Sequence, residues 1–453
     1  MAFPIADDNL KVTPPQHAPG AGDVKKKADG RWQNLRHSWK TTDFALLWAG
    51  SAISTIGTRT LGVAYPLLAL ALTDSPSVAG WTGFALTIPI LVFYVPAGVL
   101  VDRVPARSSM LFAEFMRGLT VASVLVALPF GGPSLAHLIV AALLEGTLWV
   151  LYTLAETSLL PSLVQPATMR RALAKSEAAA HAASLAGRPL GGYLFGVGHI
   201  VPFFANAVLF LVSSGLFFHV RRAPARPPSG PSLLRDLLQG FRLLKGQPFL
   251  RASILLVTIT NLMVNALIMI FLAGSSGLPS LTVGLVLAAG GVGGVVGSIV
   301  AFSCRPFRRM LMIHLWIWVV ALGCAAAGAA LDQRAPLFAL ALFVTGLGGA
   351  LSNVSIRTVE VDAVDPRALA RVVGVSRLSA HGALSLAAPL GGLLVSGLGV
   401  TGGSVLLFAV MAVLAVLVSS VPSLRENLTP ALPAAADVGT SVDVVPPAVE
   451  HHA

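Results

Sequence analysis

Long apolar stretches separated by short polar connections make up most of this chain. Each stretch contains roughly 20 or more predominantly apolar residues, the length that an α-helix needs to cross a bilayer. Several stretches exceed this length and require a tilted helix. The pattern predicts an all-α membrane protein with twelve transmembrane helices, at residues 44–72, 79–101, 109–129, 134–160, 172–197, 200–220, 250–274, 281–303, 309–330, 335–360, 369–397 and 401–421.

The polar connections are of two kinds, which alternate along the chain. One kind is short and nearly uncharged, as in Asp74-Ser75-Pro76, and the other is basic, as in Arg103 to Arg107. Of the 31 Lys and Arg residues, 26 fall on the basic side, four fall within helices, and only Arg334 falls on the other side. Because cytoplasmic loops carry the excess of Lys and Arg, we expect a multi-pass protein of the inner (plasma) membrane with both termini in the cytoplasm.

The composition agrees with a surface covered by lipid. Hydrophobic residues form 55% of the chain, charged residues form 11%, and the mean hydropathy is +0.79, whereas soluble domains carry about 25% charged residues. The net charge of +11 comes from basic loops on one side of the membrane, so we expect no nucleic-acid partner. Cys304 and Cys324 fit neither a disulfide framework nor a metal site, and no Gly-x4-Gly-Lys-Ser/Thr loop occurs. We therefore expect no metal, no cofactor and no direct use of ATP.

Two related segments lie about 200 residues apart. Ser184 begins the run Ser-Leu-Ala-Gly-Arg-Pro-Leu-Gly-Gly, and Ser385 begins the run Ser-Leu-Ala-Ala-Pro-Leu-Gly-Gly. The connections after the second and eighth helices also match, in the same order and at nearly the same spacing, which favours duplication over chance. We therefore predict two six-helix halves in parallel orientation around a central cleft. The expected division is a disordered tail at 1–40, an N-terminal half at 41–220, a linker at 221–249, a C-terminal half at 250–421 and a disordered tail at 422–453.

A charged motif joins the second and third predicted helices. It reads Gly98-Val-Leu-Val-Asp102-Arg103-Val-Pro-Ala-Arg107. Gly98 allows a neighbouring helix to approach closely, and Asp102 can accept hydrogen bonds from a helix N-terminus or a basic side chain. Glu156, which ends the fourth helix on the same side, is a candidate partner for Arg103 or Arg107. We predict that these five residues form a latch that holds the halves together in one conformation only; the alternative is an ordinary basic loop.

The motif resembles the signature of the major facilitator superfamily, in which Gly, a Leu two positions later and Asp-Arg precede basic residues. Further matches are Phe44, Trp48, Gly50, Ile53, Ser54, Gly57, Pro89, Arg117, the run 160–164, the run 240–242 and the run 389–392. They make the chain from about Leu35 to Val421 similar to the drug:proton antiporters, a branch that includes macrolide, tetracycline and siderophore exporters. The resemblance implies that the first and fourth helices of each half line the cavity. The chain departs from the branch at Thr58, where many relatives carry an acid, and at Arg188, which interrupts a Gly-Pro pair.

Ionisable residues inside a membrane helix are costly to bury, so they are functional candidates. Glu145 lies about ten residues, or ~15 Å, into the fourth helix, near the middle of a hydrocarbon core about 30 Å thick. We predict that it pairs with Arg59 of the first helix and carries the coupling proton or a cationic part of the substrate. The alternative is an ion pair that only orients the helices. Asn261 and Asn265 share a face of the seventh helix, where they bind substrate or bridge helices.

Glu114 and Arg117 lie three residues apart in the third helix. At that spacing, opposite charges on one helix face can pair. We predict that they form a structural ion pair.

These features favour a transporter over an enzyme, because the acidic residues are scattered rather than clustered with His at one face. We predict a secondary active transporter that couples protons to the efflux of small amphipathic compounds, such as a drug or secondary metabolite, by alternating access. A uniporter or an importer of a small metabolite is one alternative, and a non-transporting membrane scaffold is an alternative of another class. The expected partners are a small-molecule substrate, protons and the lipid bilayer, and we expect a monomer.

Overall fold

The computed structural model describes residues 21–164, 168–221, 239, 241–244, 246–303, 309–363 and 366–422. Nearly all of these residues are helical, and none of them forms a strand. The first half of the chain contains α1 (Ala21–Thr73), α2 (Pro76–Thr87), α3 (Pro89–Arg103), α4 (Ala106–Ala127), the 3-10 helix η1 (Leu128–Phe130), α5 (Leu135–Leu163), α6 (Met169–Val197) and α7 (Val201–His219). The second half contains α9 (Pro248–Ala273), α10 (Ser280–Ser303), α11 (Met310–Ala330), α12 (Arg334–Ala363) and α13 (Pro366–Ser420).

The helices lie where the apolar stretches predict them. Among the described residues, ten helical segments are long and apolar enough to cross a membrane. The ten do not include α6, whose first half carries several Lys and Arg residues, and they count α13 once. The chain reverses within α13 at Gly399, whose φ of 69° lies in the left-handed region that glycine tolerates. With α6 and the second limb of α13 included, the prediction of an all-α protein with twelve membrane helices is confirmed.

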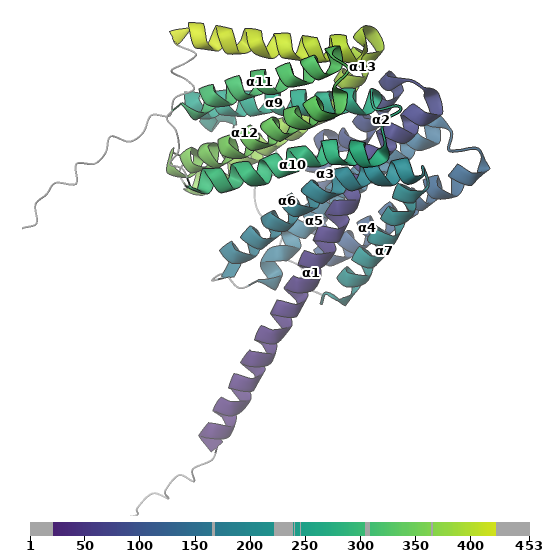
Figure 1. Cartoon of the computed structure of the whole chain (residues 1–453). Coiled ribbons are helices and arrows are strands. Elements are labelled where there is room, and N and C mark those ends of the chain that lie inside the picture. The colour runs from purple at the N-terminus through teal and green to yellow at the C-terminus, as the bar shows by residue number, and fades with distance from the viewer. Residues whose placement is uncertain are drawn as a thin grey trace, which may run out of the picture.

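α1 extends further toward the N-terminus than the sequence predicts. The helix begins at Ala21, in the region 1–40 for which we expected disorder, and the extension projects away from the bundle in Figure 1. Residues 21–40 contain four Lys and two Arg, which are good helix formers. Turns added to an existing helix also avoid the cost of nucleation. The expectation of disorder therefore does not hold for residues 21–40, whereas residues 1–20 lie outside the described part of the chain.

The second predicted helix, 79–101, is divided into α2 and α3. Pro89 begins α3 and has no N–H to donate, and the Leu91 N–H donates to the Ile88 carbonyl at 2.9 Å instead of to that of Thr87. The Thr87 carbonyl instead accepts a hydrogen bond from Ser385 Oγ of α13 at 3.0 Å. The break at the proline thus provides a polar contact between the two halves.

The helices form two bundles that meet at one end. Figure 1 shows α1 to α7 in one bundle and α9 to α13 in the other, and the closest contacts between them join α2 to α13 and α6 to α10. A Cβ on Gly80 of α2 would lie 2.6 Å from the Ala388 carbonyl oxygen of α13, so the two backbones touch there. Gly196, in the last turn of α6, packs in the same way against Ser280 at the start of α10. We call this end, where α1 ends and α2 begins, the closed end.

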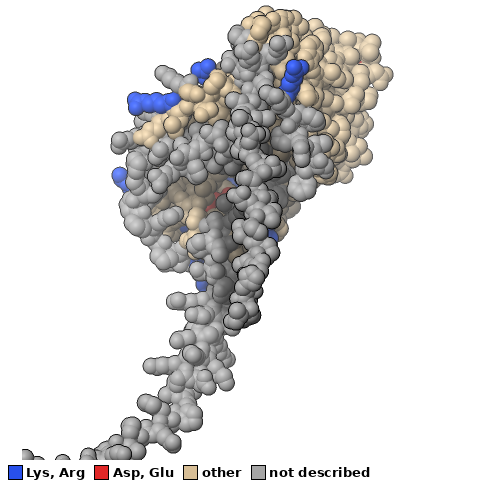
Figure 2. Space-filling view, turned by 90° about the vertical axis from the view of Figure 1, so that its left-hand side faces the viewer, with Lys and Arg blue, Asp and Glu red and all other residues tan. Residues whose placement is uncertain are grey.

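The other end carries the basic connections, and we call it the basic end. Arginines there include Arg103, Arg107, Arg221, Arg242, Arg251 and Arg309. In Figure 1 the two bundles diverge toward this end. Figure 2 looks onto the basic end and shows Lys and Arg around the edge, with an acidic side chain inside a recess. The space between the halves is therefore reached from the basic end.

Large apolar side chains cover the outside of both bundles. Phe112 and Leu211 in the first half, and Leu285 and Val410 in the second, are among many that are exposed. Exposed apolar surface on this scale is not found on monomeric soluble proteins, and here the hydrocarbon of a bilayer can cover it.

Candidate functional site

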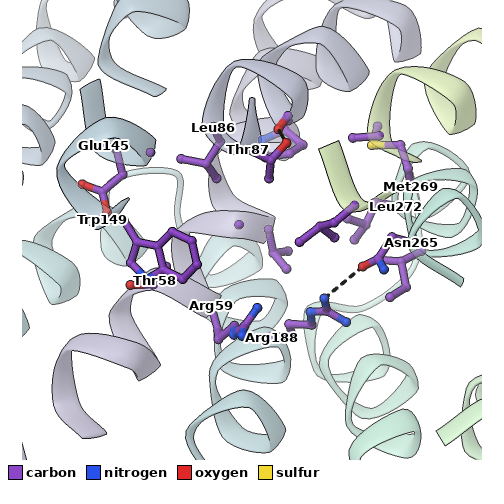
Figure 3. A pocket seen from close by; sticks show the side chains of 18 of the residues that line it. Thr58, Arg59, Leu86, Thr87, Glu145, Trp149, Arg188, Asn265, Met269 and Leu272 are labelled. Carbon is purple, nitrogen blue, oxygen red and sulfur yellow. Dashed lines mark hydrogen bonds between the residues drawn. The ribbon is translucent and has the colours of Figure 1, made fainter. Parts of the chain in front are cut away.

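A cavity lies between the two bundles. Its empty volume, counted together with the open space at its mouth, is about 980 Å³. The first half supplies walls from α1, α2, α3, α5 and α6, and the second half supplies walls from α9 and α13 (Figure 3). The principal lining side chains are apolar at Val63, Leu86, Ile90, Trp149, Ile268, Met269, Leu272 and Leu384, and polar or charged at Thr58, Arg59, Thr87, Glu145, Arg188 and Asn265.

The polar residues of the cavity lie at mid-depth in the membrane. Glu145, Arg188 and Asn265 are ten, nine and eight residues from the closed-end termini of α5, α6 and α9, which corresponds to ~12–15 Å along each helix. The hydrocarbon core of a bilayer is about 30 Å thick. The charges therefore lie where water is scarce and unpaired charge is costly.

Arg117 of α4 is the centre of a buried hydrogen-bond network. Its Nε and Nη2 donate to Glu145 Oε1 of α5 at 2.9 and 2.6 Å, and its Nη1 donates to Glu114 Oε1 at 2.7 Å. From α1, Ser54 Oγ and Thr58 Oγ1 accept from Nη1 and Nη2 at 2.9 and 2.6 Å. These five bonds use all five N–H donors of the guanidinium group. One side chain thus ties α1, α4 and α5 together.

Aromatic rings enclose the same guanidinium group. The Arg117 Cζ lies 4.1 Å from the centroid of the Phe210 ring of α7 and 5.8 Å from that of Tyr152. Both positions favour a cation over an aromatic face. Because Arg117, Glu114 and Glu145 are almost fully buried, the network is shielded from water except where Glu145 and Thr58 line the cavity.

The network holds two carboxylates but only one guanidinium group. Oε2 of Glu114 and Oε2 of Glu145 have no hydrogen-bond partner among the described residues. A surplus buried negative charge is unfavourable, and one bound proton removes it. Glu145 lines the cavity, whereas Glu114 does not. Glu145 is therefore the carboxylate of this network that borders the cavity.

The ion pairs differ in part from those that the sequence predicts. Glu114 and Arg117 pair at 2.7 Å, as their spacing on one helix predicts. The expected pair between Glu145 and Arg59 was wrong, because Glu145 pairs with Arg117 at 2.6 Å. α4 packs directly against α5, so Arg117 reaches Glu145, while Arg59 lies on the part of α1 that packs against α6.

Arg59 lies beside Arg188 of α6 on the cavity wall (Figure 3). The Nη2 of Arg188 donates to Oδ1 of Asn265 at 3.0 Å, a hydrogen bond that joins the first half to the second. Among the described residues neither arginine forms an ion pair, and Arg59 Nε has no hydrogen-bond partner. The two guanidinium groups are close enough to repel each other electrostatically. The sequence reading missed Arg188 as a site residue, although a charge in the middle of a membrane helix was a sufficient signal.

Close packing of α1 against α6 brings the two arginines together. A Cβ on Gly187 would lie 2.5 Å from the Cβ of Arg59, so a larger residue at position 187 would separate the helices. Thr60 Oγ1 also donates to the Gly187 carbonyl at 3.1 Å. The glycine next to Arg188 thus fixes the position of both arginines.

The two asparagines of α9 have different surroundings. Asn265 lines the cavity, whereas Asn261 is not among the lining residues. Asn265 Nδ2 donates to the Asn261 carbonyl at 2.8 Å, which orients the Asn265 amide toward Arg188. Asn261 therefore acts on the cavity only through its backbone. In the part of the chain that the structure describes, no cluster of three His, Cys, Asp or Glu residues could hold a metal.

The predicted latch residues lie at the basic end. Arg103 ends α3 and is exposed. Nη2 of Arg107 donates a hydrogen bond to the Phe218 carbonyl near the end of α7, and Cζ of Arg107 lies 5.7 Å from the centroid of the Phe218 ring. Glu156 of α5 is partly buried, and the side chain of Asp102 lies outside the described residues. The described contact of Arg107 lies within the first half, so a latch between the halves stays a prediction.

Gly98, the first residue of the latch motif, is buried within α3. It lies between the cavity end of α3, where Ile90 lines the wall, and the basic end. Its burial agrees with the close helix approach that a glycine permits.

The fold and the cavity define a class of protein. Two helical bundles that pack at one end and enclose a charged cavity at mid-depth form the architecture of a secondary membrane transporter. The sequence pattern of the Major Facilitator Superfamily matches residues 47–303, more than half of the chain. The protein belongs to the Major Facilitator Superfamily, and it is a multi-pass membrane transporter.

Several proteins are similar to it over most of their length. The uncharacterized MFS-type transporter y4rN of Sinorhizobium fredii is 26% identical over 362 residues, which cover 78% of this chain and 88% of the relative. The uncharacterized MFS-type transporter YfiS of Bacillus subtilis is 24% identical over 349 residues, which cover 74% of this chain and 82% of the relative.

Solved structures share the fold at lower sequence identity. The nucleoside transporter NupG superposes with a TM-score of 0.64 at 14% identity, over 84% of this chain and 98% of NupG. A bacterial homologue of the iron transporter ferroportin, in an inward-facing state, superposes with a TM-score of 0.62 at 17% identity, over 84% of this chain and 99% of the homologue. At these identities the likeness concerns the fold alone.

Proposed function

We propose that this protein is a proton-coupled transporter that exports small amphipathic compounds from the cytoplasm by alternating access. The observation that carries the proposal is the position of Glu145, which belongs both to the Arg117 network and to the cavity wall. A proton on Glu145 removes the surplus negative charge and weakens its attraction to Arg117. Because that attraction ties α5 to α4, protonation changes how firmly a cavity-lining helix is held, which is the linkage that coupled transport requires.

The cavity wall supports an amphipathic substrate. Apolar side chains such as Trp149, Met269 and Leu272 provide most of the surface, and a few polar groups provide direction. The similarity to drug:proton antiporters noted in the sequence supports the same class of compound. The packing of the two halves at the closed end, and their separation at the basic end, supports alternation between two open states.

The direction of transport follows from the orientation that we propose. If the basic end faces the cytoplasm, the cavity in this structure is open to the cytoplasm, where an exporter takes up its substrate. A cysteine introduced at Ser276, in the exposed connection between α9 and α10, is then expected to react with an impermeant thiol reagent added outside intact cells. A cysteine at Ser229, in the connection between the halves, is expected to stay unlabelled. The reverse labelling pattern contradicts the orientation and, with it, the direction of export.

A transport screen tests the proposed activity. We expect cells that produce the protein to accumulate less of some small amphipathic compounds than cells that lack it, and an uncoupler to abolish the difference. A difference that survives the uncoupler would contradict proton coupling. Greater accumulation in the producing cells would identify an importer. If the accumulation of every compound is unchanged at normal protein abundance, the protein is not an exporter of this class.

A further inference from the structure

We propose that the transported compound is an organic anion, such as a carboxylate, phosphate or sulfonate, and that Arg59 and Arg188 bind its charged group. This inference rests on the proposed transport function of the same cavity. Three arginines lie within or beside the cavity, and they differ in their hydrogen-bond and ion-pair partners. Arg117 is fully paired, whereas Arg59 and Arg188 have no carboxylate partner among the described residues.

The hydrogen bonds make this difference quantitative. All five N–H donors of Arg117 are used. Arg59 and Arg188 together present ten such donors, and among the described residues they form one side-chain hydrogen bond, from Arg188 to Asn265. Because both arginines line the cavity, they retain N–H donors that a ligand there can use.

The charges lead to the same conclusion. Within the Arg117 network alone the carboxylates outnumber the guanidinium group, but Arg59 and Arg188 reverse the balance of the whole region. Among the described residues, its three guanidinium groups and two carboxylates leave a surplus of one positive charge, even with Glu114 and Glu145 both ionised. A proton on Glu145 raises the surplus to two. Two neighbouring guanidinium groups at mid-depth repel each other, and an anion between them replaces that repulsion with attraction. Guanidinium groups suit this role because their planar donors match carboxylate and phosphate oxygens.

The surrounding side chains indicate the rest of the molecule. In Figure 3, Arg59 and Arg188 lie on one side of the pocket, and Leu86, Met269 and Leu272 line other parts of it. An anion bound by the two arginines therefore directs an apolar body toward those side chains. The Arg188–Asn265 bond places the charged group where both halves meet, so the bound anion contacts the interface that must rearrange during transport.

A cysteine reporter can measure the charge of the cavity without knowledge of the substrate. Gly62 lies one helical turn after Arg59 and lines the cavity, and a Cβ on it would have no heavy atom within 4 Å. The experiment uses purified protein in which Cys304 and Cys324 are replaced by Ser. The rate at which Gly62→Cys reacts is measured with an anionic reagent, sulfonatoethyl methanethiosulfonate, and with a cationic reagent, trimethylammonium-ethyl methanethiosulfonate. The ratio of the two rates, divided by the ratio for Ser276→Cys at the closed end, reports the local potential.

We expect the anionic reagent to be favoured about tenfold at Gly62→Cys relative to Ser276→Cys, because low-dielectric walls focus the field of the arginines. Arg59→Gln and Arg188→Gln should each lower that ratio about three- to tenfold. Two controls are matched to them. Arg251→Gln removes an exposed arginine at the basic end and should leave the ratio within about twofold. Arg59→Lys keeps the charge and should keep the ratio.

Protection of the same cysteine identifies the ligand class. Naphthalene-1-carboxylate and 1-naphthyl phosphate should slow the modification of Gly62→Cys more than the neutral naphthalene-1-carboxamide or the cationic 1-naphthylmethylammonium. Arg59→Lys should weaken this protection, because an ammonium lacks the paired donors of a guanidinium group. The proposal is overturned if the amide or the ammonium protects better, or if none of the four compounds protects. It is also overturned if the reagent ratio favours the cation, or if neither arginine substitution changes that ratio.

The experiment separates this inference from the proposed function, because it uses purified protein without a proton gradient. If the cavity prefers anions but the protein shows no gradient-driven export, the inference stands and the proposed function fails. If the protein exports a cationic or neutral compound against a gradient and the cavity shows no preference for anions, the proposed function stands and the inference fails.

Discussion

In the first half, Arg117 joins α4 to α1 and α5, and in the second half His314 joins α11 to α9 and α12. His314 Nδ1 lies 2.7 Å from Ser352 Oγ, and its Nε2 lies 3.4 Å from Thr260 Oγ1. His314 is also 200 residues after Glu114, which is the spacing of the sequence repeat. The two networks therefore connect corresponding helices. The first is built from carboxylates and a guanidinium group, and the second from an imidazole and two hydroxyl groups.

The difference indicates how the two halves divide the work. A network with two carboxylates and one cation can exchange a proton, and it lies beside a cavity that also contains Arg59 and Arg188. The His314 network has no carboxylate among the described residues and does not line the cavity. We infer that the first half carries the coupling chemistry, and that the second half supplies the packing surface and Asn265.

The largest expected contrast between the two networks is in stability. Arg117→Gln leaves two buried carboxylates without a cation. Breaking a buried ion pair in this way lowers the free energy of unfolding by about 3–5 kcal/mol. His314→Leu removes neutral hydrogen bonds and costs about 1–3 kcal/mol. Thermal unfolding of the purified variants in detergent measures both effects, and wild-type protein in the same detergent is the control. Equal losses would show that the two networks are equivalent structural supports.

A smaller contrast concerns the loops at the basic end. In the first half Asp102 lies in the last turn of α3, at the start of the basic connection, whereas the corresponding run from Cys304 to Arg309 contains no acid. Asp102→Asn should therefore slow transport about 5- to 10-fold, the lower end of the range that typical coupling free energies give, without changing membrane abundance or apparent substrate affinity. Arg309→Gln, in the loop of the second half, should change the rate less than about twofold. Wild-type rates for Asp102→Asn at normal abundance would rule out the latch.

The smallest expected effects come from single hydroxyl groups. Ser54→Ala removes a partner of both Arg117 and Glu114 and should cost about 1.5–3 kcal/mol, because its hydrogen bonds involve charged groups. Ser352→Ala removes a neutral bond to His314 and should cost about 1 kcal/mol. Thermal unfolding compares the two variants directly. A larger loss for Ser352→Ala would place the more important polar network in the second half.

The sequence predicts the helices well because the bilayer imposes a length and a composition on each of them. It predicts the Glu114–Arg117 pair for a similar reason, since the helix itself fixes the relative position of two residues that lie three positions apart. The partner of Glu145 was not predictable in this way. It depends on which face of α4 turns toward α5 and how closely α1 approaches α6, and those rotations are set by packing contacts such as that of Gly187.

Two further differences have local causes. The sequence places Pro89 inside one helix, and the missing N–H divides that helix. The Thr87 carbonyl, to which Leu91 does not donate, then accepts a hydrogen bond from Ser385 of the other half. Arg188 was read only as a departure from a familiar pattern, since its hydrogen bond to Asn265 joins residues 77 positions apart. Contacts over such separations require the fold.

The central claim, that Glu145 couples protons to substrate movement, is tested most directly by Glu145→Gln in everted membrane vesicles with a compound found by the accumulation screen. The amide retains an oxygen that can accept a hydrogen bond from Arg117, but unlike a carboxylate it cannot bind and release a proton during transport. We predict that accumulation driven by a pH gradient falls to the level of vesicles without the protein, while exchange of labelled for unlabelled substrate without a gradient continues. If Glu145→Gln still accumulates substrate against its gradient, and an uncoupler still abolishes this accumulation, the coupling site lies elsewhere.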